Sequence, residues 1–163
     1  MRNLELNKIG YISAAGAATV FVVAVVLFVF SPEQHNDRYN LAFPDTAGGA
    51  LHHEWRILPD RDGVQERVQL LIEEMMLGPV TLGAVPFLPE RSDLRSVVYD
   101  HADRTIYIDF DAAFFVETED GRFPFVDLKH LIETNLRHNI PQIDRIIVTV
   151  AGQLPEVPRF EGL

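Results

Sequence analysis

The sequence predicts a small α+β domain, a two-layer β-α-β-β-α-β sandwich, behind one N-terminal transmembrane helix. Three features of the 163-residue chain predict this class. Residues 9–30 form an uncharged apolar run, and residues 51–152 alternate between segments of period two and segments of helical spacing. The third feature is a pair of amphipathic helical patterns, because two such helices can cover one face of a small sheet.

The apolar run is long enough to be a membrane anchor. It contains 22 residues without Asp, Glu, Lys or Arg, and a spanning helix needs about 20 apolar residues. A cleaved signal peptide is the alternative, with an apolar core of about 7–15 residues and a small-x-small cleavage site. Because the run is longer and ends in the bulky Phe30, we favour an uncleaved anchor.

Charge predicts the orientation of the anchor and excludes several partners. Arg2 and Lys8 precede the run and Glu33 is the first charge after it, so residues 1–8 are expected in the cytoplasm and the domain outside. The part after the run carries 12 basic and 23 acidic residues. This balance excludes nucleic acid and a flat anionic lipid surface as partners. The chain has no cysteine, so disulfides, thiol catalysis and a lipidated Cys are excluded.

Two segments flank the predicted domain, which covers residues 51–152. Residues 31–50 indicate a linker, because they contain prolines and the Gly48-Gly49 pair and have no sustained period. Docking of Leu41 and Phe43 on the domain is the less favoured alternative. Residues 153–163 contain two closely spaced prolines and are expected to form an extended C-terminal tail.

The first half of the domain predicts a strand and then a helix. Residues 51–58 alternate apolar and polar side chains, which is typical of a half-buried strand. Asp62 with Gln65 resembles a capping box at a helix start. Apolar residues then follow at helical spacing, and Gly78-Pro79 is a typical helix end. The members of this apolar stripe are Val64, Val68, Leu71, Ile72 and Met75.

The second half predicts a hairpin, a helix and a last strand. Residues 94–99 and 105–110 are expected to pair as a hairpin, followed by an acidic excursion over residues 112–122. Asp127 is the expected cap of the second helix, which Pro141 ends. The continuous apolar run at residues 144–150 predicts a strand in the centre of the sheet.

Several of these segments resemble the GerMN domain, the module of sporulation and spore-germination proteins of the GerM type. Residues 68–79 resemble its helix with the "GP" stop, and residues 105–110 resemble its "tvyVdls" strand. Further likeness lies in residues 87–90 with Leu94, residues 131–136 and residues 143–152, all in the family's order.

This resemblance implies a membrane-tethered, extracytoplasmic module of the bacterial envelope, with a fold similar to the ring-building modules of sporulation and secretion assemblies. It carries over no catalytic residues. The chain departs from several relatives in having an apolar helix in place of a lipidated Cys, and one module where some relatives have two.

Asp109 and Asp111 are the strongest candidates for chemistry, because residues i and i+2 of a strand point to one face. A structural role, with the carboxylates capping main-chain N–H groups at a strand end, is the more favoured interpretation. The adjacent His52 and His53 would point to opposite faces, so no metal site is expected. The acidic residues 117–120 lack the oxygen spacing of a calcium loop.

Aromatic residues are frequent and open two interpretations. They either form lids over the core or form an exposed contact patch with a charged rim. The residues concerned are Trp55, Phe87, Phe114, Phe115, Phe123 and Phe125.

The sequence therefore predicts a non-enzymatic scaffold or assembly factor of the cell envelope, without a cofactor. Its expected partners are envelope proteins, copies of itself included, and residues 9–30 would hold it in the membrane. One alternative is a cell-wall or carbohydrate-binding module, which a deep pocket lined by aromatic residues and by Asp109 and Asp111 would favour. The other is an envelope hydrolase that uses Asp109 and Asp111.

Overall fold

The computed structural model describes residues 35–46, 50–119 and 123–155, together with Phe21. The chain divides into two units, residues 1–35 and 36–163, and the strands and helices below belong to the second. Residues 1–8 and the predicted anchor, residues 9–30, lie outside the described part apart from Phe21. Among the residues described, no helix combines the length and the apolar character needed to cross a membrane.

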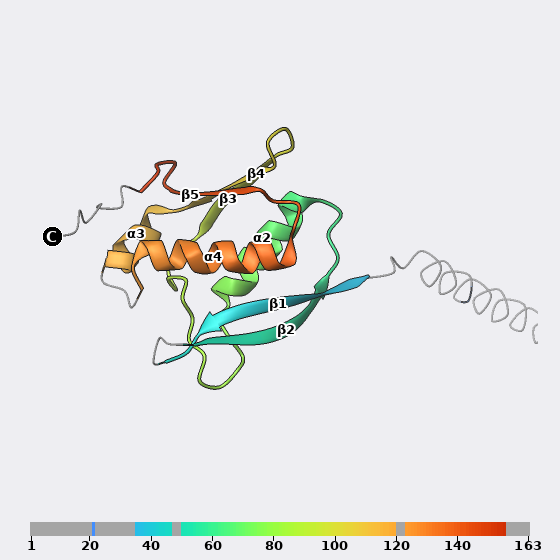
Figure 1. Cartoon of the computed structure of the whole chain (residues 1–163), viewed down its shortest axis with the longest axis horizontal. Coiled ribbons are helices and arrows are strands. Elements are labelled where there is room, and N and C mark those ends of the chain that lie inside the picture. The colour runs from blue at the N-terminus through green and yellow to red at the C-terminus, as the bar shows by residue number, and fades with distance from the viewer. Residues whose placement is uncertain (1–20, 22–34, 47–49, 120–122, 156–163) are drawn as a thin grey trace, which may run out of the picture. The chain divides into compact units, whose positions relative to one another are not determined.

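The described residues of the domain form two sheets and three helices (Figure 1). The first sheet pairs β1 and β2 in antiparallel fashion, and the second has the order β3-β4-β5, with β3 antiparallel and β5 parallel to the central β4. In chain order the elements are β1 (Asn36–Pro44), β2 (Leu51–Pro59), α2 (Val64–Met76), β3 (Leu94–Asp100), β4 (Thr105–Phe110), α3 (Ala112–Glu119), α4 (Phe125–Asn139) and β5 (Arg145–Val150).

Helices α2 and α4 lie between the two sheets in Figure 1, so the predicted two-layer sandwich with one sheet is wrong, and one apolar core joins both sheets and the helices. Helix α4 packs on β1, and α2 packs on β3. The core includes the apolar stripes of both helices and the inward side chains of β4, as their periodicity predicts. Fully buried members are Leu71, Ile72, Ile106, Ile108, Phe110, Ile132 and Leu136.

The predicted linker over residues 31–50 is wrong for residues 36–44, which form β1. Tyr39, Leu41 and Phe43 point into the core, and the last two are fully buried. The strand is held by its nine-residue ladder with β2 and by contacts with α4. The folded domain therefore begins with a strand that precedes the predicted boundary.

Both predicted helix caps are also wrong. Helix α2 begins after Gly63, which makes no side-chain cap, so Asp62 does not cap it. Helix α4 begins after Pro124, which places Asp127 in the first turn, where its charge favours the positive end of the helix dipole. The predicted C-terminal ends of both helices are confirmed. Helix α2 stops before Gly78, which has a φ of 78°, and α4 stops before Pro141.

Two other predictions in the second half need correction. Part of the predicted acidic excursion is helix α3, whose start is capped by Asp111. The last strand, β5, lies at an edge of its sheet, and β4 occupies the centre. The burial of β5 alternates, with Ile146, Val148 and Val150 inside, so its apolar run reflects one buried and one half-covered face.

Candidate interaction surface

The Asp109 carboxylate holds the turn that follows β5. The Thr149 hydroxyl and the main-chain N–H of Gly152 both donate to Asp109 Oδ1, at 2.7 and 2.8 Å. The other oxygen, Oδ2, lies 3.0 Å from Nη1 of Arg95 on β3. The predicted capping role of this aspartate is therefore what the structure shows.

The Asp111 carboxylate serves a different segment. Its Oδ1 accepts the main-chain N–H groups of Asp93, at 3.2 Å, and of Phe114, at 3.3 Å. These bonds fix the start of α3 and the approach to β3. Each of the two carboxylates thus binds its own set of main-chain groups, as in a strand end rather than an acid–base pair.

Asp109→Ala is expected to destabilise the domain by about 1–3 kcal/mol, because the Thr149 hydroxyl and the Gly152 N–H lose their acceptor. Asp109→Asn keeps an oxygen in place and should lose less than about 1 kcal/mol. Urea unfolding followed by circular dichroism measures both losses. Equal losses in the two variants would contradict this role.

The histidines do not converge on a metal site. Within the described residues, no group of three or more His, Asp or Glu side chains is placed to hold an ion. The side chains of the acidic residues 117–120 lie outside the part of the chain that is described.

Most of the candidate aromatic residues belong to the core. Phe87 packs on Phe43 with ring centroids 5.8 Å apart, and Phe114 stacks on Phe110 at 4.3 Å. Phe115, Phe123 and Phe125 are half-buried and pack against the same core. Trp55 differs, because 59% of its surface is exposed.

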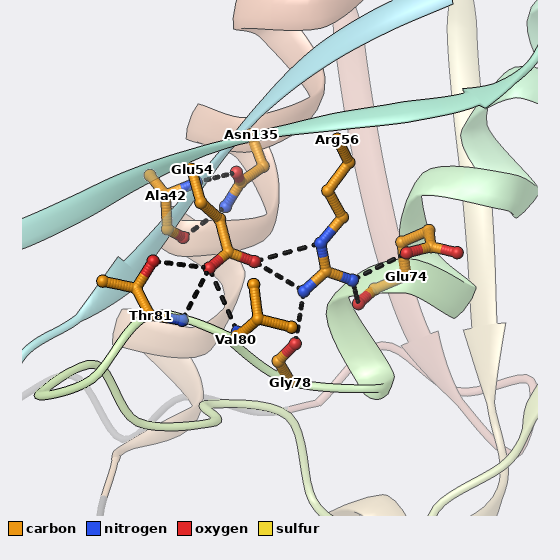
Figure 2. Close-up of polar contacts among 8 residues, drawn as sticks. All are labelled: Ala42, Glu54, Arg56, Glu74, Gly78, Val80, Thr81 and Asn135. Atoms are coloured by element: carbon orange, nitrogen blue, oxygen red, sulfur yellow. Dashed lines mark hydrogen bonds and ion pairs between the residues drawn. The ribbon is translucent and has the colours of Figure 1, made fainter. Parts of the chain in front are cut away.

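Strand β2 buries its polar face. Glu54 is only 6% exposed, and its Oε1 lies 2.6 Å from Nη2 of Arg56. Arg56 also binds Glu74 of α2 at 2.6 Å, and it donates to the carbonyls of Glu74 and Gly78 (Figure 2). The period-two pattern of residues 51–58 thus predicts a strand correctly, but its buried side carries an ion-pair network.

The segment after α2 completes this network. The N–H groups of Val80 and Thr81, and the Thr81 hydroxyl, donate to Glu54 Oε2 at 3.0–3.2 Å (Figure 2). Burial alone would raise the pKa of Glu54, but the hydrogen bonds from Arg56, Thr81 and Val80 outweigh it and lower the pKa below 4.5. Burial likewise acts to lower the pKa of Arg56. The hydrogen bonds to Glu74 and Glu54 outweigh burial, so the pKa of Arg56 is raised above its ordinary value.

The outer face of β2 carries the apolar side chains instead. Trp55 and Ile57 are 59% and 69% exposed, and Leu51 is also exposed. The Arg38 guanidinium of β1 lies 4.8 Å from the centre of the Trp55 ring. Three more exposed apolar residues lie in the segment that binds Glu54 and Arg56 from the core side, namely Leu77, Val80 and Leu82.

The two edges of the β1–β2 sheet differ. Asn135 of α4 accepts the N–H of Ala42 at 2.7 Å and donates to its carbonyl at 3.0 Å. Asn139, one turn later, does the same for Asn40, at 2.9 and 2.8 Å. Two helix amides therefore take the place of a neighbouring strand at Asn40 and Ala42 on the outer edge of β1.

In an antiparallel ladder, alternate residues direct their main-chain N–H and C=O groups away from the partner strand. On β2 these outward groups form an edge that no other described strand covers. Asn40 faces Trp55 and Ala42 faces His53 in the ladder. Since Asn40 and Ala42 point their main-chain groups at α4, these are non-hydrogen-bonded pairs, and Trp55 and His53 point theirs away from β1. Ile57 follows by alternation. No described residue makes a main-chain hydrogen bond to these three positions on the outer edge.

Comparison with known proteins rests on the fold. No protein-family model and no curated protein matches the sequence. The tandem GerMN domains of the sporulation protein GerM from Bacillus subtilis align with a TM-score of 0.51 and 15% identity, over 74% of this chain and 41% of that one. The chain has a GerMN-like fold. A protein of Clostridium perfringens assigned as a lipoprotein aligns with a TM-score of 0.39 and 21% identity, over 72% of this chain and 76% of that one.

The GerMN-like fold confirms the resemblance drawn from the sequence. The resembling segments fall on α2 and its end, on β4, within α4, and on β5 with its following turn. This chain spans less than half of the GerM chain, which carries the domain in tandem.

The described part of this GerMN-like domain has a hollow of about 350 Å³ beside α4. Its lining includes Leu51, Asp127, His130 and Leu131 and a single aromatic residue, Phe123. Asp109, Asp111 and Trp55 are not in it. The hollow therefore does not bring Asp109 and Asp111 together with the candidate aromatic residues in the way that the carbohydrate-binding alternative predicts.

Proposed function

We propose that the chain is a membrane-tethered, extracytoplasmic module of the bacterial cell envelope that acts as a scaffold or assembly factor through protein contacts, without catalysis. Residues 9–30 form its single span, with the N-terminus in the cytoplasm. The GerMN-like fold supports an envelope role of the sporulation or germination type. Its partners are envelope proteins, copies of itself included.

One observation carries the proposal: β2 exposes Trp55 and Ile57 while it buries Glu54 and Arg56. Burial of a charged pair needs several compensating hydrogen bonds, which the network provides, whereas exposure of large apolar side chains gains nothing in a lone domain. Exposed apolar groups rimmed by charge are typical of a contact surface. The candidate aspartates, by contrast, are occupied by main-chain groups.

Photo-crosslinking in cells tests this function. A photoreactive amino acid replaces Ile57 in the full-length chain, and a matched variant carries it at Val98, which is 52% exposed on the other sheet. We expect protein adducts, identified by mass spectrometry, from position 57 and few from position 98. Adducts with glycan fragments alone, or equal adducts from both positions, would contradict the proposal.

A further inference from the structure

We propose that the open edge of β2 binds the same edge of a second copy of this chain, antiparallel, with Trp55 opposite Trp55 across a twofold axis. This inference rests on the proposed function and deepens it, because it names the partner and the contacting strand. The result is one continuous four-stranded sheet, β1-β2-β2-β1.

The first argument is the difference between the edges. Asn135 and Asn139 satisfy the outer main-chain groups of Asn40 and Ala42, so α4 blocks the middle of the β1 edge against a further strand. The N–H and carbonyl groups of His53, Trp55 and Ile57 point outward from β2 without a described partner. An exposed edge of this kind is a template for strand addition, and natural proteins protect such edges unless they are used.

The second argument is charge, which selects both the partner and the register. With Trp55 on the axis, Glu54 of one copy lies opposite Arg56 of the other, and the reverse pair forms as well. A shift by two residues in one direction places Glu54 opposite Glu54, and in the other direction Arg56 opposite Arg56. Directly opposed like charges destabilise a strand pair, and opposite charges stabilise it. Each of these side chains is also paired on the core side within its own copy, so the pairs between copies add to an existing network and favour this register over the two shifted ones.

The third argument is the fit of the remaining side chains. In the same register His53 lies opposite Ile57 of the second copy, and Leu51 lies opposite Pro59. Proline therefore falls at the end of the new ladder, where its missing N–H disturbs the pairing least. The two Trp55 rings meet on the outer face, where paired aromatic rings stabilise a contact beyond the burial of their area. Arg38 of each copy already lies over its own ring.

The exposed residues Leu77, Val80 and Leu82 strengthen the argument. Their segment binds the core-facing residues Glu54 and Arg56, whereas Trp55 and Ile57 lie on the outer face. Exposed apolar side chains therefore also belong to the segment that binds β2 from its core side. A contact of one strand and its flanks is small, so the membrane tether supports it by raising the local concentration of copies.

Disulfide trapping tests the pairing, since the chain has no cysteine of its own. Full-length single-cysteine variants Trp55→Cys, Ile57→Cys and Val98→Cys are compared in isolated membranes under mild oxidation. In the proposed register the two residues at position 55 form a hydrogen-bonded pair with Cα atoms about 5.5 Å apart, which a disulfide can bridge. The two residues at position 57 are separated by about 13 Å, four residues along the strand.

We expect Trp55→Cys to form a disulfide dimer about tenfold or more faster than Val98→Cys, because only its paired Cα atoms lie within bridging range. Ile57→Cys alone should not exceed this control, whereas co-expression of Ile57→Cys with His53→Cys should trap the mixed dimer. Circular dichroism of each variant confirms that it is folded. Rapid self-trapping of Ile57→Cys would overturn the register.

Trapping of Trp55→Cys no faster than Val98→Cys would overturn the self-pairing itself. If photo-crosslinking from position 57 then yields another envelope protein, the proposed function stands and the partner is a different chain. If it yields no protein, the proposed function fails too.

Discussion

Arg56→Met is expected to destabilise the domain by about 3–5 kcal/mol, the loss typical of removing one partner from a buried ion pair. Arg56 joins Glu54 of its own strand to Glu74 and Gly78 at the end of α2. Without the guanidinium, the buried Glu54 carboxylate has no counter-charge, and the contact between β2 and α2 loses its polar bonds. Chemical unfolding of the purified full chain, followed by circular dichroism, measures the loss.

The same substitution on the outer face is the control. Arg38 lies over Trp55 on the outer face of the β1–β2 sheet. Arg38→Met should therefore lower the free energy of unfolding by only about 0.5–1 kcal/mol, as expected for an exposed cation–π contact. Comparable losses in the two variants would show that the network of Arg56 contributes little to stability.

The effect of Arg56→Met should also depend on pH. The folded pKa of Glu54 is lowered, so its contribution to stability is present above its unfolded pKa, near 4.5, and is lost as the pH falls through the folded value. In Arg56→Met, burial instead favours the neutral acid. The difference in unfolding free energy between wild type and variant is therefore expected to shrink from pH 7 towards pH 3. A constant difference over this range would contradict the assignment.

The second large effect is expected for Asn135→Leu, at about 2–4 kcal/mol. Asn135 is almost fully buried and satisfies both main-chain groups of Ala42, besides the carbonyl of Leu131. Leucine has a similarly branched but larger side chain that offers no hydrogen bond, and each buried main-chain group left unpaired costs about 1–3 kcal/mol. Chemical unfolding gives the total loss, and hydrogen exchange at the Ala42 amide reports the edge itself.

Asn139→Leu is the matched comparison. Asn139 makes the equivalent pair of bonds to Asn40, but it is half-buried, so water can replace part of what is lost. Its loss should be about 1 kcal/mol, near the net value of an ordinary hydrogen bond. If the Ala42 amide exchanges no faster in Asn135→Leu than in Asn139→Leu, the edge is protected by other means.

Local periodicity was sufficient to predict the helices α2 and α4 and the hairpin of β3 and β4. In α4, Leu128, Ile132 and Leu136 recur at helical spacing and point into one core, so the pattern and the packing agree. β1 also carried a signal, because Tyr39, Leu41 and Phe43 alternate. The nearby prolines and glycines favoured a linker, and only the tertiary contact with α4 decides for a strand.

The orientation of β2 could not be predicted in the same way. Hydrophobicity places Trp55 and Ile57 inside and Glu54 and Arg56 outside, whereas the structure does the reverse. The reason is tertiary, because the partners of Glu54 and Arg56 lie 18–27 positions further along the chain. No pattern within β2 reveals that these partners will meet it. The helical spacing places Asn135 on the apolar face of α4, but no local pattern reveals that its amide binds Ala42 of β1.

The helix amides on β1 limit the size of any assembly that this sheet can build. Because α4 blocks the β1 edge at Asn40 and Ala42, the proposed strand addition uses the β2 edge, and a sheet with one reactive edge is complete once that edge is used. Fibrils and endless ribbons need two reactive edges per molecule. The proposed pairing of two β2 edges therefore does not continue into a fibril. An arc or ring of many copies would have to recruit a second, different surface, with the β2 pair as its repeating unit.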